Sequence, residues 1–141
     1  PPELAQKIAQ QHPGTVEERK NGALVVSGQT LLGVARFLKD TPGLDFDYLA
    51  SVTGVDYLDY FEVVYHLVSL TQNHSAVLKV RLQDRQAPAL PSVVGVWRGA
   101  ELQEREVYDL MGISFTGHPN LKRVFLWEGF PGHPLRKDFF Y

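Results

Sequence analysis

Residues 44–82 carry the pattern that most constrains the fold. Three segments rich in β-branched and aromatic residues, FDYLASVTGVDY, FEVVYHLVSL and AVLKVRLQD, are separated by short polar or turn-forming stretches. Segments of this composition and length are typical of β-strands. In the middle segment both alternating sets of residues are largely apolar, which is typical of a central strand covered on both faces. The sequence therefore predicts three consecutive strands in meander order.

Helical and hairpin patterns precede these strands. Apolar residues recur at helical spacing in residues 1–10 and again in residues 30–41, where a Pro-Gly step follows. Between the two predicted helices, the pair Asn21-Gly22 separates short strand-like runs and predicts a tight hairpin turn. The second helix is expected to bury one face, formed by Leu31, Val34, Ala35 and Leu38.

A third helix is expected at residues 98–111, after a connection interrupted by prolines. Runs of strands with helices before and after them are typical of an α+β fold. We therefore expect a small mixed, mainly antiparallel sheet with flanking helices and an extended, irregular C-terminal arm. With 141 residues the chain is long enough for one domain with its own core. The expected division is a single domain over residues 1–141, with a core at about 1–112 and the arm at about 113–141.

The composition excludes several classes of function. The chain has no cysteine, so it holds no disulfide, no Cys-ligated zinc or iron–sulfur cluster and no cysteine nucleophile. The formal net charge of -2 provides no basic surface of the kind that binds nucleic acid, and no glycine-rich phosphate-binding signature occurs. No apolar run approaches the roughly 18 to 20 residues that span a bilayer. We expect no nucleic-acid partner and no direct insertion into a membrane.

The segment ELQEREVYDLMG concentrates charge on the third predicted helix. Glu101, Arg105 and Asp109 stand at i, i+4 and i+8, which places alternating charges on one helical face. This spacing favours a solvated ladder of ion pairs, and a buried ionic network against a partner protein is the alternative. Glu104 and Glu106 point to different sides of a helix, so a paired-carboxylate active site is disfavoured. The apolar face opposite the ladder is expected to contain Val107, Leu110 and Met111.

Two Gly-His-Pro steps, containing His118 and His133, follow the third helix. The glycine permits a sharp entry and the proline restricts the histidine to extended backbone, so a turn with the imidazole bonded to backbone is favoured. Neither histidine has a second ligand three or four residues away, which disfavours a metal site. A contact with a partner or a pH-sensitive role stays open.

The expected C-terminal arm combines basic pairs with aromatic residues. Arginine and aromatic side chains are the usual anchors of protein interfaces, and so much aromatic area favours a covering partner. The alternative, equally open from composition, is that the aromatic residues fold back on the sheet of this chain. The residues concerned are Lys122, Arg123, Phe125, Trp127, Phe130, Arg136, Lys137, Phe139, Phe140 and Tyr141.

Together, EREVYDLMGISFTGHPNLKRVFL and GHPLRKDF resemble the signature region of the 30 kDa (C) subunit family of respiratory complex I, the proton-translocating NADH:quinone oxidoreductase. The strand-like segments upstream are also similar, so the resemblance covers roughly residues 44–140. Met111 departs from it, because an aromatic residue is expected before the glycine. The residues that match the family signature, and that the resemblance implies as a subunit interface, are Glu104, Arg105, Glu106, Asp109, Gly112, Gly117, His118, Pro119, Lys122, Arg123, Pro134, Leu135, Arg136, Lys137 and Asp138.

The resemblance implies a subunit of the hydrophilic arm that binds no cofactor and carries no catalytic residue of its own. It also implies tight binding to the 49 kDa (D) subunit and to other hydrophilic-arm subunits, which together form the quinone-reducing module. NADH, FMN, iron–sulfur clusters and quinone are then bound by other subunits. In a bacterium, such a chain lies at the cytoplasmic side of the plasma membrane and reaches the membrane only through the complex.

Three other interpretations stay open from the sequence. Related domains belong to the photosynthetic plastoquinone-reducing complex and to energy-converting hydrogenases, which the signature does not separate cleanly from complex I. A stand-alone hydrolase or lyase using Glu104 or Asp109 with His118 is a rival from another class, and an adaptor outside bioenergetics is another.

Overall fold

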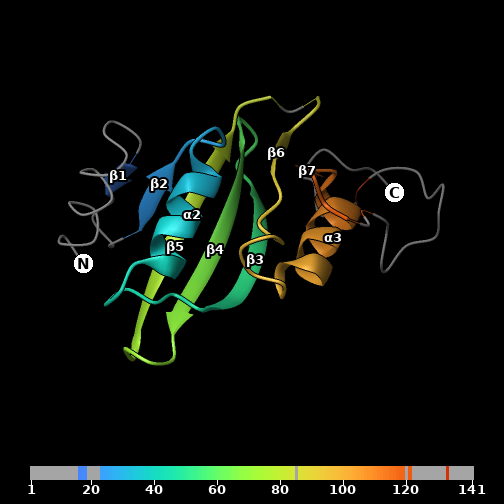
Figure 1. Cartoon of the computed structure of the whole chain (residues 1–141). Coiled ribbons are helices and arrows are strands. Elements are labelled where there is room, and N and C mark those ends of the chain that lie inside the picture. The colour runs from blue at the N-terminus through green and yellow to red at the C-terminus, as the bar shows by residue number, and fades with distance from the viewer. Residues whose placement is uncertain (1–15, 19–22, 85, 120, 122–132, 134–141) are drawn as a thin grey trace.

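The computed structural model describes residues 16–18, 23–84, 86–119, 121 and 133 (Figure 1). Within these residues the chain forms seven strands and two helices. They are, in chain order, β1 (Val16–Glu18), β2 (Leu24–Val26), α2 (Leu31–Asp40), β3 (Tyr48–Asp56), β4 (Phe61–Ser69), β5 (His74–Leu82), β6 (Ala89–Pro91), α3 (Ala100–Met111) and β7 (Ser114–Thr116).

The main sheet has five strands in the order β1-β2-β5-β4-β3. The meander β3-β4-β5 is antiparallel throughout, and β1 pairs with β2 as an antiparallel hairpin. Within this described sheet, only the contact between β2 and β5 is parallel, with Leu24 opposite Leu78. The expected α+β fold with a mixed, mainly antiparallel sheet is therefore confirmed. The helix predicted at residues 1–10 and the turn at Asn21-Gly22 lie outside the described residues.

Helix α2 lies against one face of the sheet (Figure 1). Its buried residues are the four that the helical spacing predicted, Leu31, Val34, Ala35 and Leu38. They pack with the residues that point to the same face of the strands, among them Tyr65, Leu67 and Leu78, each fully buried. Alternation along each strand and helical periodicity along α2 thus build one continuous apolar core.

The central strand β4 is covered on both faces along its first half. Phe61, Val63 and Tyr65 face the core, while Glu62, on the opposite face, is only 2% exposed. The Glu62 carboxylate lies 3.4 Å from Arg81 Nε and 3.7 Å from Lys79 Nζ on the neighbouring strand, so its buried charge is paired. Cover on both faces is confirmed here but ends at His66, which is exposed.

Strands β6 and β7 form a second, two-stranded parallel sheet beside β3, together with α3 (Figure 1). The sequence did not predict β6, because Pro88 and Pro91 bound it and proline removes a backbone donor. Ile113 and Phe115 belong to the buried core. The core therefore extends beyond residue 112, into the segment that was expected to be an irregular arm.

Candidate partner interface around helix α3

The two glycines of the family-like segment that follow α3 have a direct structural explanation. Helix α3 ends where Gly112 adopts φ +75°, and the Gly112 N–H donates to the carbonyl of Tyr108 at 2.9 Å. Gly117 has φ +84° at the end of β7. Glycine takes this left-handed conformation without the steric cost of a side chain. Both residues are therefore required by backbone geometry, which directs the chain back along α3.

Glu104 is a fully buried carboxylate at the centre of α3. Ser92 donates its hydroxyl to Oε1 at 2.6 Å, and the backbone N–H of Val93 donates to Oε2 at 2.9 Å. Burial raises the pKa of Glu104, while the bonds from Ser92 and Val93 and the nearby His118 act in the opposite direction. Glu104 thus attaches the middle of α3 to the loop that precedes it.

Tyr65 of β4 belongs to the same buried region. Its side chain is fully buried and its hydroxyl has no hydrogen-bond partner within the described structure. Burial raises the pKa of Tyr65 well above its ordinary value, and the charge of Glu104 raises it further. A neutral tyrosine beside a buried carboxylate offers no acid or base that a substrate could reach.

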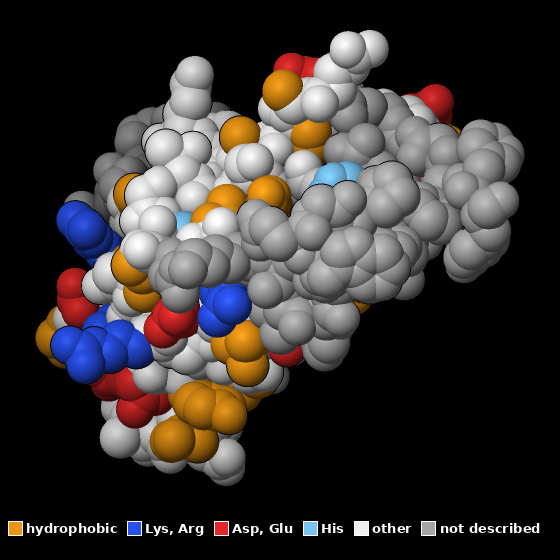
Figure 2. Space-filling model, turned by 90° about the vertical axis from the view of Figure 1, so that its right-hand side faces the viewer, with side chains coloured by type: hydrophobic (Ala, Val, Ile, Leu, Met, Phe, Trp, Pro, Cys, Tyr) orange, Lys and Arg blue, Asp and Glu red, His pale blue; other side chains and the backbone are white. Residues whose placement is uncertain are grey.

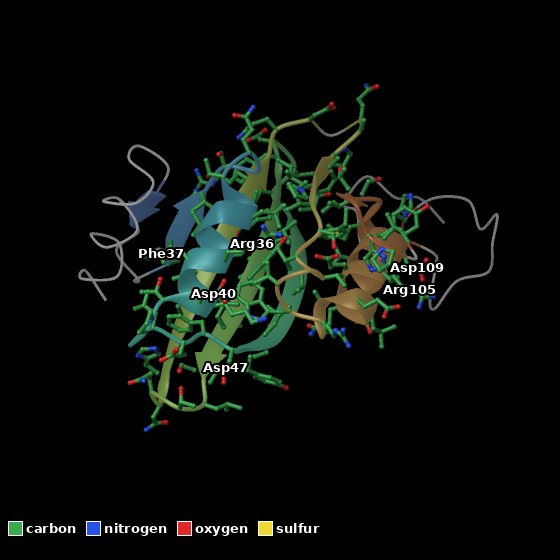
Figure 3. The ribbon with its side chains drawn as sticks, viewed as in Figure 1. Arg36, Phe37, Asp40, Asp47, Arg105 and Asp109 are labelled. Atoms are coloured by element: carbon green, nitrogen blue, oxygen red, sulfur yellow. The ribbon has the colours of Figure 1, made fainter. Side chains whose placement is uncertain are left out.

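The predicted solvated ladder on α3 is wrong at Asp109. Glu101 is exposed and Arg105 is partly buried, but Asp109 is completely buried. Figure 3 shows Arg105 and Asp109 on the same flank of the helix. The residues expected on the apolar face divide as well, because Val107 and Met111 are buried whereas Leu110 is only partly buried. Helical spacing groups residues by side, and only the surrounding chain decides which side is covered.

The two Gly-His-Pro histidines hydrogen-bond to carbonyls of the same helix. His118 Nε2 lies 2.8 Å from the carbonyl oxygen of Glu101, and His133 Nδ1 lies 2.9 Å from that of Asp109. The His133 ring also lies 6.4 Å from the ring of Tyr108. The predicted bond between imidazole and backbone is confirmed for both. The sequence did not reveal that the two steps contact opposite ends of one helix.

A groove lies between α3 and β3, the edge strand of the main sheet. Its volume is about 200 Å³. Gln103 of α3 reaches across to β3, where its Oε1 accepts the N–H of Val52 at 2.8 Å. Sequence reasoning passed over Gln103, because nothing nearby in the chain marks it as the partner of an edge strand. The residues lining this α3–β3 groove are Val52, Thr53, Gly54, Glu106, Val107, Leu110 and Met111.

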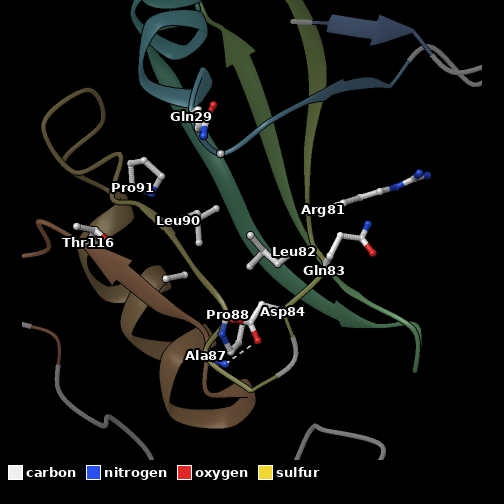
Figure 4. A pocket seen from close by; sticks show the side chains of 12 residues that line it. Gln29, Arg81, Leu82, Gln83, Asp84, Ala87, Pro88, Leu90, Pro91 and Thr116 are labelled. Atoms are coloured by element: carbon white, nitrogen blue, oxygen red, sulfur yellow. Dashed lines mark hydrogen bonds between the residues drawn. The ribbon is translucent and has the colours of Figure 1, made fainter.

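Two larger depressions lie elsewhere. One of about 520 Å³ lies where β5 ends beside β6, and its charged lining residues are Arg81 and Asp84 (Figure 4). Both are engaged, because Arg81 pairs with Glu62 and Asp84 accepts the N–H groups of Gln86 and Ala87. The other, of about 470 Å³, is lined by Lys39, residues 47–49 and residues 94–99, none of which is a histidine.

The described residues contain no group of three or more histidine, aspartate or glutamate side chains arranged to hold a metal ion. Likewise, no helix in the described part of the chain is long and apolar enough to cross a membrane. Several predicted interface residues lie outside the described residues, so the structure does not place them. These are Lys122, Arg123, Phe125, Trp127, Phe130, Pro134, Leu135, Arg136, Lys137, Asp138, Phe139, Phe140 and Tyr141.

This architecture is shared with a chain in the structure of the membrane-bound sulfane sulfur reductase, an archaeal respiratory membrane complex. The TM-score is 0.81 at 25% identity, and the match covers 98% of this chain and 84% of that one. The fold is therefore of a class found in respiratory membrane complexes. The chain belongs to the family described as respiratory-chain NADH dehydrogenase, 30 Kd subunit, whose model matches residues 24–141. The match begins earlier than residue 44, so the family extends over β2 and α2 as well.

Curated relatives agree with this family. The C subunit of NADH-quinone oxidoreductase from Roseiflexus sp. (strain RS-1) is 47% identical over 128 residues, which are 89% of this chain and 73% of that relative. The second C subunit of the enzyme from Rhizobium meliloti (strain 1021) is 46% identical, over 83% of this chain and 65% of the relative. The Azorhizobium caulinodans C subunit is 44% identical, over 97% of this chain and 67% of its own length. This chain therefore spans about two thirds to three quarters of these relatives.

Proposed function

We propose that the chain is a cofactor-free structural subunit in the hydrophilic arm of a proton-translocating NADH:quinone oxidoreductase. In this role it helps to assemble the quinone-reducing module with the 49 kDa (D) subunit and other hydrophilic-arm subunits. The observation that carries the proposal is the family match over residues 24–141, together with relatives named as the C subunit of NADH-quinone oxidoreductase. NADH, FMN, iron–sulfur clusters and quinone are bound by other subunits under this proposal. The chain is peripheral and lies on the cytoplasmic side of the membrane.

The internal bonds of the signature residues support a structural role. Glu104 uses both carboxylate oxygens to hold the loop before α3, and His118 bonds to the backbone of the same helix. These contacts fix the position of α3 without placing a reactive group at the surface. A helix held in this way presents its remaining side chains, such as Glu106, with little conformational freedom, which lowers the entropic cost of binding a partner.

The stand-alone hydrolase is disfavoured by the same geometry. Glu104 is 0% exposed and accepts two hydrogen bonds, and Asp109 is also 0% exposed. A general acid or base must come within hydrogen-bond distance of its substrate. Among the related complexes, the 47% identity to an NADH-quinone oxidoreductase subunit favours that enzyme over the sulfane sulfur reductase, with 25%.

The proposal is tested by purifying a tagged chain in mild detergent from cells that make the whole complex. We expect iron–sulfur absorbance, quinone reductase activity and the 49 kDa subunit to copurify. Arg105→Ala should reduce their recovery several-fold, whereas Arg36→Ala, on the exposed side of α2 (Figure 3), should leave it unchanged. Recovery of only a colourless soluble partner would contradict the proposal, as would full assembly and activity with Arg105→Ala.

A further inference from the structure

The α3–β3 groove exposes an edge of the main sheet. β3 is the last strand in the order, so backbone groups that do not pair with β4 point away from the sheet. Val52 is one of the residues whose backbone faces away from β4, because its N–H donates to the side chain of Gln103 on α3. By the alternation of an antiparallel ladder, Gly54 also directs its N–H and carbonyl outward. The groove wall on this side therefore offers the carbonyl oxygens of Val52 and Gly54 as acceptors.

Glu106 of α3 lines the opposite wall of the groove. This residue is partly buried, and it makes no hydrogen bond or ion pair within the described part of the chain. The lack of a partner there distinguishes Glu106 from two buried acids, Glu62 and Glu104, which are bonded. A carboxylate in a partly apolar groove gains most from a cation that brings several donors with it.

The floor and flanks of the groove are apolar. Val107 and Met111 are buried beneath it, and Gly54 permits their approach: a Cβ at Gly54 would lie 3.1 Å from Val107 and 3.2 Å from Met111. Leu102 and Leu110 stand one turn to either side of Glu106 on α3, and Leu102 is 50% exposed. Figure 2 shows the molecule from the right-hand side of Figure 1, and hydrophobic side chains stand there next to acidic and basic ones among the described residues. The half-exposed Leu102 and the partly buried Leu110 thus add apolar area beside Glu106 that a partner can cover.

We propose that the α3–β3 groove receives an arginine side chain from a partner subunit. This inference rests on the proposed function, which supplies the partner subunits. The methylene stem lies on Leu110 and Met111, and the guanidinium donates to the Glu106 carboxylate and to the outward carbonyls of β3. Arginine is the cation that this acceptor-rich site selects, because its planar group offers five donors and no acceptor and is weakly hydrated. The groove volume of about 200 Å³ limits the guest to one side chain.

The test compares Glu106→Gln with Glu101→Gln in the assembled complex. Both variants remove one negative charge from α3, but Glu101 is exposed and lies outside the groove. Glu106→Gln should weaken retention of the chain in the complex by about thirtyfold or more, since truncating one partner of a buried charge pair usually has this effect. It should also reduce the sensitivity of retention to salt, while Glu101→Gln behaves as the wild type. Thermal unfolding of each isolated variant should match the wild type.

A charge reversal identifies the guest. Glu106→Lys should abolish retention, and reversal of one arginine in a copurifying subunit to glutamate should restore it. Equal retention of Glu106→Gln and Glu101→Gln in an otherwise intact complex overturns the groove inference while leaving the proposed function standing. A self-association of the isolated chain that Glu106→Gln abolishes overturns it too, because the guest is then a second copy. Failure of the wild-type chain to copurify with quinone reductase contradicts the proposed function instead.

Discussion

Replacement of Glu104 by alanine should destabilise the chain more than replacement of an exposed charged residue on α3, such as Glu101. The substitution leaves the N–H of Val93 without an acceptor in a region where Val93 is 0% exposed, and it removes the acceptor of the Ser92 hydroxyl. A buried polar group left unsatisfied costs about 1 to 3 kcal/mol. Removing the carboxylate also removes the cost of burying it, which offsets part of the loss of the two hydrogen bonds. We therefore expect the free energy of unfolding to fall by about 2 to 4 kcal/mol.

Urea unfolding followed by tryptophan fluorescence measures this loss, since Trp97 is buried in the core beside the same loop. Glu104→Gln should cost less, roughly 1 kcal/mol, because its amide oxygen still accepts from Val93 and its NH₂ group donates to Ser92. Glu101→Ala, at an exposed position of the same helix, is the control and should stay within about 0.5 kcal/mol of the wild type. A loss for Glu104→Ala no larger than that of the control would refute the reasoning.

The pH dependence of the free energy of unfolding, compared between the wild type and Glu104→Gln, tests the burial of the carboxylate. Burial raises the pKa of Glu104 above its ordinary value of 4.5, so the folded state binds the proton more tightly than the unfolded state. The stabilising contribution of the protonated acid is then complete below the unfolded pKa and declines as pH rises through the folded pKa. Glu104→Gln does not titrate at this position. Relative to it, the wild type should lose stability as pH rises above about 4.5, the ordinary pKa of the glutamate side chain. An advantage of the wild type that grows with pH would contradict this.

Two further substitutions probe the folded chain directly. Tyr65→Phe removes a hydroxyl that is buried without a partner in the described structure, and we expect thermal unfolding to show unchanged or increased stability, by up to about 1 kcal/mol; a loss of more than this would show that the hydroxyl is satisfied. Leu58 adopts φ +73° with its side chain 59% exposed, so Leu58→Gly should raise stability by about 0.5 to 1 kcal/mol. Leu70→Gly, where the side chain is 68% exposed and the backbone is not left-handed, should lower stability; a loss at both positions would exclude strain at Leu58.

The elements that the sequence predicted well are those whose signals are local. The β-branched and aromatic composition of β3, β4 and β5 and the helical spacing of the buried face of α2 are signals within a few residues. Polar or turn-forming stretches mark where the strands end, and a Pro-Gly step follows α2. The histidine contacts were also predictable in kind, because the flanking glycine and proline fix the backbone around each ring. The family signature identified α3 and the following segment as the region of interest, although it did not assign a contact to any residue.

The errors on α3 have a common physical cause. Glu104 and Asp109 are charged, so the sequence pattern placed Asp109 on the wet face of the helix and left Glu104 without a structural role. Burial of Glu104 depends on donors from Ser92 and Val93, which only the folded chain brings to it. Leu102, by contrast, is left half exposed because nothing in the described fold covers that side. The face of a helix that is buried therefore does not depend on apolar residues alone, because a polar residue with hydrogen-bond partners can be buried as well.

The sequence by itself determined the fold class, the meander and the family, because periodicity, turn chemistry and signature spacing are all written along the chain. Tertiary structure alone decided the parallel pairing of β2 with β5, the strands β6 and β7, and the groove between α3 and β3. These depend on contacts between segments far apart in sequence, such as the bond between Gln103 and Val52. Neither residue of such a contact is marked by its neighbours in the sequence, because the contact stabilises the fold only once both segments are in place.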